Sequence, residues 1–440
     1  MDWLRQSACA IGRGIGAGDV DPVELTDAYL EAAKVHPYGA RIYARTTRDR
    51  ALSEAIAAHD RAKHGIRRGL LDGVPISWKD LFDTAGVATE AGSLLLQGRV
   101  PSEDAEVLAN ATRAGLVCLG KTHMTELAFS GLGVNPSTAT PPNGTDPELA
   151  PGGSSSGAAT SVAYGLAAAG IGSDTGGSVR LPSAWNDLVG FKPTHGALSL
   201  KGVVPLAASF DTVGPLCRTV EDCAEIFAVM GNTAAPDLRE ASLEGARLLV
   251  LTPYSIDVRE APGSAFHSAV ERLNRAGALI ETANIPAVDE AMETTLSLYT
   301  AEAYGTWGKV IEANPDKMFH QIRDRFRQGS TVMAADFVAL WQRLRELRIE
   351  YYAATAGYDA VLIPSAANLP PNVARLDSDD DYFVTENLLT LRNTRVGNLM
   401  GACALTLPTG VPATGIMLMC PPGDDARLLR LARAAELALA

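Results

Sequence analysis

The sequence is poor in residues that several large classes of function require. Aromatic residues make up 6% of the 440 residues, which disfavours a platform of rings for stacking bases. The 38 Lys and Arg are outnumbered by 51 Asp and Glu, and the net charge of −13 disfavours nucleic acid as the main partner. No stretch approaches the roughly 20 apolar residues of a membrane span, and the N-terminus does not resemble a secretory signal. We therefore expect a cytoplasmic enzyme that acts on a small molecule, with no nucleic-acid or membrane partner.

Cysteine and histidine are also scarce, which limits disulfide and metal chemistry. None of the cysteines form a CxxC pair, so we expect free, buried thiols in a reducing compartment. None of the seven histidines are four residues apart, as two metal ligands on one helix face would be. We expect neither a metal ion nor another cofactor. The cysteines are Cys9, Cys118, Cys217, Cys223, Cys403 and Cys420.

Short apolar runs alternate with helical patterns along most of the chain. This alternation predicts an α/β protein in which helices cover both faces of a sheet. A mostly helical stretch at about 285–356 is better interpreted as a cap on that sheet than as a separate domain. Although the length would allow two or three domains, we expect one large domain over 1–440. The expected strands include 116–119, 169–174, 248–251, 360–363, 405–407 and 416–419.

Two glycine-rich segments invite a nucleotide-binding interpretation that their details do not support. Gly152 and Gly157 have the spacing of a P-loop, but Ala158 and Ala159 stand where Lys and Ser or Thr are required. The segment 12–18 contains four glycines without the spacing or the preceding strand of a dinucleotide fingerprint. We expect a turn between helices there.

A third segment, 172–180, follows the strand that begins near Ala169, at the edge of the sheet where ligands bind. Its glycines would let the backbone N–H groups of 175–178 converge on one point, which is the geometry of an oxyanion hole. Ser178 would then be placed as a nucleophile. The alternative is a strand-to-helix turn in which Ser178 is an N-cap.

A nucleophilic serine needs a base. No histidine lies in the glycine- and serine-rich segments 151–157 and 172–180. Lys79 is a second candidate, because it follows apolar residues on an expected strand and desolvation would lower its pKa. Serine and lysine form known nucleophile–base pairs. The alternative for Lys79 is an ordinary solvated surface charge.

The combination of segments carries more information than any of them alone. In order and spacing, 73–82, 151–157 and 173–182 resemble the amidase signature family. The resemblance covers nearly the whole chain, is strongest over about 71–230 and is weak over about 240–358. It implies a single domain built on a mixed central sheet.

The resemblance also implies a Ser–cis-Ser–Lys triad. Ser178 would be the nucleophile, Ser154, with a cis peptide bond, would relay its proton, and Lys79 would be the ultimate base. Attack on an amide would give an acyl-enzyme that water then hydrolyses. The implied oxyanion hole comprises the N–H groups of Thr175, Gly176, Gly177 and Ser178, and the implied supporting residues are Ser155, Ser156, Asp174 and Arg180.

The implied function is hydrolysis of a C–N bond in a small amide or urea-like substrate. The alternative is the glutaminase component of a tRNA-dependent amidotransferase, its A subunit, which uses the same triad. Homodimers are common in the family, but the sequence does not identify an oligomeric state or a substrate. The pocket is expected to lie between 124–133 and helices of the 285–356 stretch, with His123, Met124, Phe129, Trp185 and Tyr299 as candidate lining residues.

Overall fold

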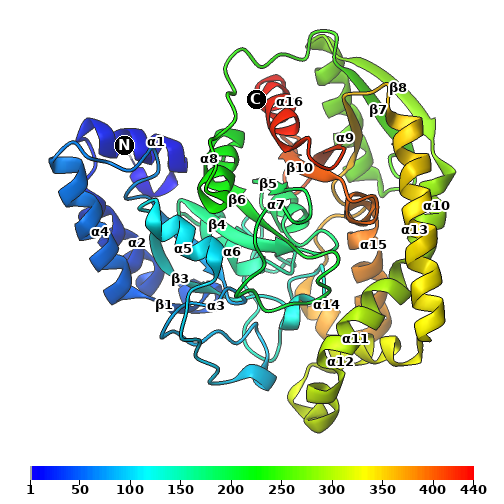
Figure 1. Cartoon of the computed structure of the whole chain (residues 1–440), viewed down its shortest axis with the longest axis horizontal. Coiled ribbons are helices and arrows are strands. Elements are labelled where there is room, and N and C mark those ends of the chain that lie inside the picture. The colour runs from blue at the N-terminus through cyan, green and yellow to red at the C-terminus, as the bar shows by residue number, and fades with distance from the viewer. Residues whose placement is uncertain (1) are drawn as a thin grey trace.

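The computed structural model describes residues 2–440, and a single mixed β-sheet forms its centre (Figure 1). The strands are β1 (Tyr43–Thr46), β2 (Pro75–Lys79), β3 (Val117–Thr122), β4 (Ala169–Asp174), β5 (Val189–Lys192), β6 (Thr212–Cys217), β7 (Arg247–Thr252), β8 (Leu279–Asn284), β9 (Ala360–Pro364), β10 (Cys403–Pro408) and β11 (Gly415–Cys420). Their order in the 11-stranded sheet is β1-β3-β2-β4-β6-β5-β10-β11-β9-β7-β8. This confirms the predicted α/β fold with a mixed sheet, and β3, β4, β7, β9, β10 and β11 confirm the six expected strands.

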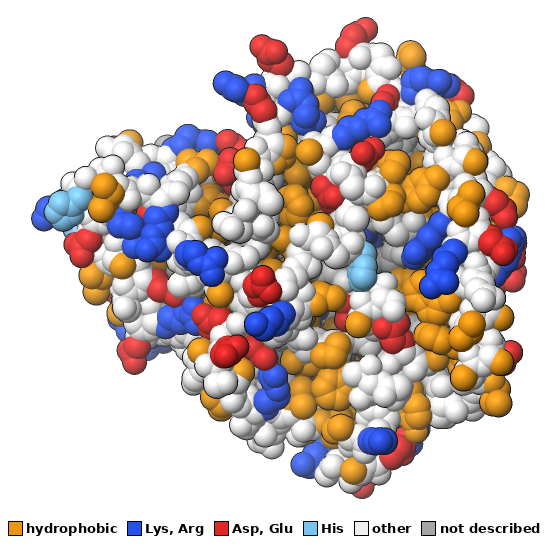
Figure 2. Space-filling model, in the orientation of Figure 1, with side chains coloured by type: hydrophobic (Ala, Val, Ile, Leu, Met, Phe, Trp, Pro, Cys, Tyr) orange, Lys and Arg blue, Asp and Glu red, His pale blue; other side chains and the backbone are white. Residues whose placement is uncertain are grey.

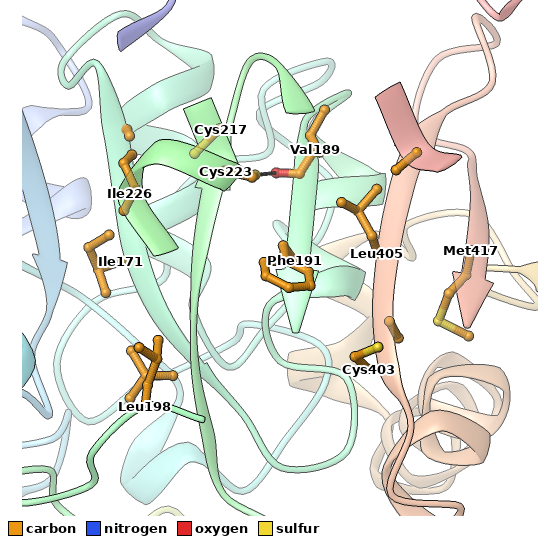
Figure 3. Close-up of a cluster of buried hydrophobic side chains, with 14 of the residues drawn as sticks. Ile171, Val189, Phe191, Leu198, Cys217, Cys223, Ile226, Cys403, Leu405 and Met417 are labelled. Atoms are coloured by element: carbon orange, nitrogen blue, oxygen red, sulfur yellow. Dashed lines mark hydrogen bonds between the residues drawn. The ribbon is translucent and has the colours of Figure 1, made fainter. Parts of the chain in front are cut away.

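The central strands are apolar on both faces, because helices cover the sheet on both sides. All residues of β4 and β11 are buried, which explains why their sequences do not alternate between polar and apolar residues. Figure 3 shows side chains of neighbouring strands, among them Phe191 of β5 and Leu405 of β10, meeting in this core. The six cysteines are unpaired and buried, as predicted, and Cys223 contacts the Val189 carbonyl oxygen at 3.8 Å.

Helices connect the strands and cover the sheet. The α-helices are α1 (Ala8–Ala17), α2 (Pro22–Val35), α3 (Gly39–Ile42), α4 (Arg48–Lys63), α5 (Glu106–Arg113), α6 (Ser156–Ala163), α7 (Arg180–Trp185), α8 (Val220–Gly231), α9 (Glu260–Arg275), α10 (Pro286–Glu293), α11 (Thr295–Ala313), α12 (His320–Arg327), α13 (Ala334–Thr355), α14 (Val373–Ser378), α15 (Asp380–Leu399) and α16 (Asp425–Ala438). Short 3₁₀ helices occupy Trp3–Arg5, Leu94–Leu96, Glu126–Ala128, Pro315–Lys317 and Gln328–Thr331.

Between β8 and β9 the chain is helical, from α10 to α13. In Figure 1 the long α13, in yellow, follows one side of the molecule, and α10 and α11 pack against it. On the face of the molecule drawn in Figure 2, acidic and basic side chains are interspersed with one another and with hydrophobic side chains. Within residues 2–440, no helix has both the length and the apolar character needed to cross a membrane.

The turn predicted for residues 12–18 is wrong, because α1 runs through these glycines to Ala17. Gly12 is needed for packing: a Cβ atom there would lie 2.1 Å from the Leu70 carbonyl oxygen. Only Gly18, in the left-handed conformation at φ 81°, ends the helix as a turn residue. The glycines therefore reflect close helix packing and not a loop.

Candidate active site

The candidate active site lies at the carboxyl ends of two parallel strands. β2 pairs in parallel with β4, so the last residues of these strands, Lys79 and Asp174, lie at the same edge of the sheet. This is the edge at which open α/β sheets place their ligands. The sheet thus brings together two segments that are almost a hundred residues apart in the sequence.

Lys79 is fully buried and points at hydroxyl groups. Its Nζ donates to Ser154 Oγ at 2.7 Å and to Ser173 Oγ at 2.8 Å. Burial lowers the pKa of Lys79 to about 7, although the negative charges of Asp174 and Asp211 oppose the shift. The interpretation of Lys79 as a solvated surface charge is therefore wrong. The amine is available as a proton acceptor near neutral pH.

The glycine- and serine-rich turn at 151–155 leads directly into α6, beside Lys79. The Gly153–Ser154 peptide bond is cis, the conformation that the resemblance implied. Ser155 Oγ donates to the Ser173 carbonyl oxygen at 3.2 Å and accepts from the Ser173 N–H at 3.3 Å. These bonds attach the start of α6 to the end of β4. The Ser154 hydroxyl is thereby held against Lys79.

Ser178 lies in the loop between β4 and α7, against the same turn. Its carbonyl oxygen accepts from the Ser155 N–H at 3.3 Å, and its side chain lines a cavity. The N-cap of α7 is Val179, so the interpretation of Ser178 as an N-cap is wrong. Within residues 2–440, no direct hydrogen bond joins the hydroxyl groups of Ser178 and Ser154.

The backbone N–H groups around Ser178 divide into two kinds. Those of Thr175, Gly176 and Ser178 have no acceptor among the described residues, and all three residues line the cavity. The N–H of Gly177 instead donates to Asp174 Oδ1 at 2.9 Å. Gly177 has a φ of 132°, and a Cβ atom there would lie 2.1 Å from Thr394 Oγ1. The expectation that Gly177 donates to an oxyanion therefore does not fit this structure. The structure does, however, require a glycine at this position.

Asp174 and Arg180 form a fully buried ion pair that holds this loop. Arg180 donates to Asp174 through Nε at 3.0 Å and Nη2 at 2.9 Å, and Asn398 Nδ2 donates to Asp174 at 2.9 Å. Burial alone would raise the pKa of Asp174, but the charge and hydrogen bonds of Arg180 hold that pKa below its usual range. The carboxylate stays ionised and accepts from the loop backbone, which is a supporting role.

We predict that Asp174→Asn lowers the free energy of unfolding by about 3–5 kcal/mol, because it leaves the Arg180 guanidinium buried without its counter-charge. Urea unfolding followed by circular dichroism would measure this loss. Asp237→Asn is the matched control, since Asp237 pairs with Arg239 on the surface and its replacement should leave the unfolding midpoint unchanged. Equal midpoints for Asp174→Asn and the wild type would contradict the structural role.

A cavity of about 470 Å³ opens at Ser178, a size suited to a small molecule. Phe129 and Tyr299 line it, as expected, and α10, α11, α12 and α15 supply most of its wall. His123, Met124 and Trp185 are wrong predictions, because none of them lines the cavity: Met124 and Trp185 are buried in the core, and His123 is half-buried outside its wall. The lining residues are Ala128, Phe129, Ser130, Thr175, Gly176, Ser178, Leu206, Met292, Glu293, Thr295, Leu296, Tyr299, Thr300, Gln321, Ile322, Asp324, Arg325, Gln328, Phe383, Val384, Asn387, Leu388, Leu391 and Arg395.

Several residues of the site were not predicted from the sequence. Ser173 is the second hydroxyl on Lys79. Asp211 accepts from Thr175 Oγ1 at 2.6 Å and so orients the loop before Ser178. Asp211 lies in the segment 210–216, which also resembles the amidase signature family and could have indicated it. Arg325 and Arg395 line the cavity from distant helices, and only the folded chain brings them to it.

Comparison with known proteins places this site in a family. A family model described as Amidase matches residues 24–429. The chain is 33% identical to a 2-amino-5-chloromuconic acid deaminase of Comamonas testosteroni, over 88% of this chain and 86% of that protein. It is 31% identical to the A subunit of the glutamyl-tRNA(Gln) amidotransferase of Chloroflexus aurantiacus, over 95% and 93%. A solved amidase structure superposes with a TM-score of 0.89 at 28% identity, over 99% of this chain and all of that one. Because the match extends from α2 to α16 and includes the segments 151–157 and 172–180, the chain belongs to the amidase signature family and is a hydrolase acting on carbon–nitrogen bonds.

Proposed function

We propose that this protein is an amidohydrolase that cleaves the amide bond of a small substrate through Lys79, Ser154 and Ser178. The observation that carries the proposal is the contact between the buried Lys79 amine and Ser154, next to a serine that faces the cavity. A lysine with a pKa of about 7 is partly neutral under physiological conditions and can accept a proton.

In the proposed first step, Ser178 Oγ attacks the carbonyl carbon of the amide. Ser154 takes the Ser178 proton while passing its own proton to the neutral Lys79 amine. The C=O π electrons move onto the carbonyl oxygen, which becomes an oxyanion. The free N–H groups of Thr175, Gly176 and Ser178 are available to stabilise that charge.

In the second step the C–N bond breaks, and the nitrogen must leave protonated. Ser154 donates a proton to that nitrogen and is reprotonated by Lys79, so ammonia or an amine departs and Ser178 stays acylated. Water then adds to the acyl carbon by the same proton path in reverse, releasing the acid and free Ser178. The enclosed site, with Lys79 and Ser154 both fully buried, favours this internal relay over exchange with bulk solvent.

The second candidate function is the glutaminase component of a tRNA-dependent amidotransferase. The 31% identity to such a protein over 95% of this chain favours it. A glutaminase of this kind would supply ammonia to a partner, and the net charge of −13 gives the chain itself little attraction for tRNA. Hydrolysis of small amides by the chain alone is therefore the function we propose.

The test is amide hydrolysis by the purified chain, without any partner, on a panel of primary amides, anilides, ureas and glutamine, followed as release of ammonia or, for the anilides, of aniline. We expect measurable turnover of at least one amide other than glutamine. Activity on glutamine alone, and only after addition of a candidate amidotransferase partner, would contradict the proposed function and support the second candidate.

A further inference from the structure

Two arginine side chains line the cavity beside Ser178 and lack carboxylate partners. Arg395, on α15, has a relative exposure of only 8%, and no hydrogen bond or ion pair to its guanidinium occurs within residues 2–440. A buried cation without a partner is costly, because it loses hydration without gaining a counter-charge. Because Arg395 lines the cavity, its guanidinium can contact a group bound there in place of a protein carboxylate.

Arg325, on α12, is the second of these side chains. It donates one hydrogen bond, to the Phe129 carbonyl oxygen at 3.0 Å, and its guanidinium carbon lies 4.5 Å from the centre of the Phe129 ring. No carboxylate lies within ion-pairing distance of it in the described chain. Arg325 and Arg395 line the same cavity. Burial first, and the charge of Arg395 second, lower the pKa of Arg325 to about 9. Both remain protonated at neutral pH.

Tyr299, on α11, adds a third polar group to this part of the cavity. Its side chain is buried, with a relative exposure of 6%, and its hydroxyl has no hydrogen-bond partner among the described residues. The Tyr299 ring stacks on Phe210 at 4.3 Å between ring centres, which fixes the direction of the hydroxyl. A buried hydroxyl without a partner is rare unless a ligand or water completes it.

The acidic residues of the cavity do not neutralise these cations. Asp324 is 57% exposed and pairs with Arg323 at 2.8 Å, and Glu293 is also exposed. Both acids therefore lie towards solvent, whereas Arg395 and Tyr299 are buried. Most of the remaining wall is apolar, with leucines from α11 and α15 among its residues.

We propose that the substrate is a small amide carrying a carboxylate, and that Arg395, Arg325 and the Tyr299 hydroxyl bind this carboxylate while an apolar spacer contacts the leucines. Guanidinium groups match a planar carboxylate with paired N–H donors, and a phenol can donate a third hydrogen bond. This inference rests on the proposed amidohydrolase function, for which it names the substrate class.

The position of Arg395 relative to the reacting atoms supports this assignment. Its neighbour Thr394 donates through Oγ1 to the Gly176 carbonyl oxygen at 2.7 Å. A Cβ atom built on Gly176 would lie 3.6 Å from Arg395 Cγ, so the arginine stem runs beside the loop that holds Ser178. A carboxylate on Arg395 would therefore belong to the same molecule as an amide at Ser178.

The test compares matched amides with and without a carboxylate: succinamate with butyramide, glutaramate with valeramide, and 4-carbamoylbenzoate with benzamide. In the wild type, kcat/KM for the best acid should exceed that of its neutral partner by about 100-fold, as expected from charged hydrogen bonds. Arg395→Met and Arg325→Met should each lower kcat/KM for the acids by about 30-fold or more, and for the neutral amides by less than about threefold.

The matched control is Arg392→Met, one turn away on α15, whose side chain pairs with Asp257 at 2.7 Å and does not line the cavity. It should retain the preference for acids. Equal kcat/KM for acids and neutral amides in the wild type, or equal losses for both in Arg395→Met, would overturn the assignment.

A binding measurement separates this inference from the proposed function. Calorimetry with Ser178→Ala should give tighter binding of glutaramate than of valeramide, and Arg395→Met added to that variant should remove the difference. If the wild type hydrolysed neither these amides nor any member of the wider panel of amides, anilides and ureas, the proposed function would fail, and binding of glutarate would still decide the carboxylate site. Equal glutarate affinity with and without Arg395 would overturn it.

Discussion

Replacement of Ser178 by alanine is expected to lower kcat for amide hydrolysis on the order of 10⁵- to 10⁶-fold, the scale known for removal of a serine nucleophile. Without Oγ no acyl-enzyme can form, although the cavity and the free N–H groups of Thr175 and Gly176 remain. Steady-state ammonia release, measured on the best substrate of the panel, would record the loss. Because Ser178 contributes only its backbone carbonyl to the Ser155 contact, the fold should be retained.

Ser183→Ala is the control for this experiment. Ser183 is a buried serine on α7, near Ser178 in sequence, and its hydroxyl has no hydrogen-bond partner among the described residues. Its replacement should leave kcat unchanged. Retention of wild-type hydrolysis by Ser178→Ala would rule out the proposed nucleophile and, with it, the mechanism.

Replacement of Lys79 by alanine is expected to lower kcat/KM by about 10²- to 10⁴-fold, the usual contribution of a general base. The base acts as the neutral amine, so the wild-type rate should rise with pH through about 7, the pKa to which burial lowers Lys79, and level off above it. In Lys79→Ala this limb should disappear, and hydroxide should restore part of the activity at high pH. A pH–rate profile of both proteins measures all three effects.

Lys121→Met provides the comparison for Lys79. Lys121 is also a fully buried lysine, on β3 beside β2, but its Nζ donates to the Phe82 carbonyl oxygen and Thr89 Oγ1. Its loss should reduce stability, since Asp80 loses a partner, while kcat per folded molecule and the pH limb persist. A wild-type pH profile without a limb near 7, or one retained in Lys79→Ala, would exclude Lys79 as the base.

The central strands could be predicted because they are buried on both faces. β9 is a continuous apolar run, and β4 is a run of apolar and small residues up to Asp174; such runs are visible without any knowledge of their partners. β8 could not be found in this way. All of its residues, Leu279–Asn284, are exposed or partly exposed at the edge of the sheet, so burial imposes no pattern on its sequence.

The proposed nucleophile, relay and base could be named from the sequence because each lies in a short local motif, whereas the proposed substrate-binding residues do not. Arg325 and Arg395 stand on α12 and α15, which lie outside the three motifs that carry the proposed catalytic residues. Their significance depends on the lack of a carboxylate partner within residues 2–440, which is a property of the folded chain. Trp185 was misplaced for the same reason: its indole N–H donates to the Asn368 carbonyl oxygen inside the core.

The hydrogen bond from Thr394 to Gly176 has a consequence for substrate length. Because Thr394 and Arg395 are consecutive residues of one rigid helix, the distance between a carboxylate on Arg395 and a carbonyl at Ser178 is fixed by the backbone of α15. Within one homologous series, an added or removed methylene group would displace the amide carbon from the attacking oxygen. The enzyme should thus discriminate among acids by the number of carbon atoms that separate their two ends.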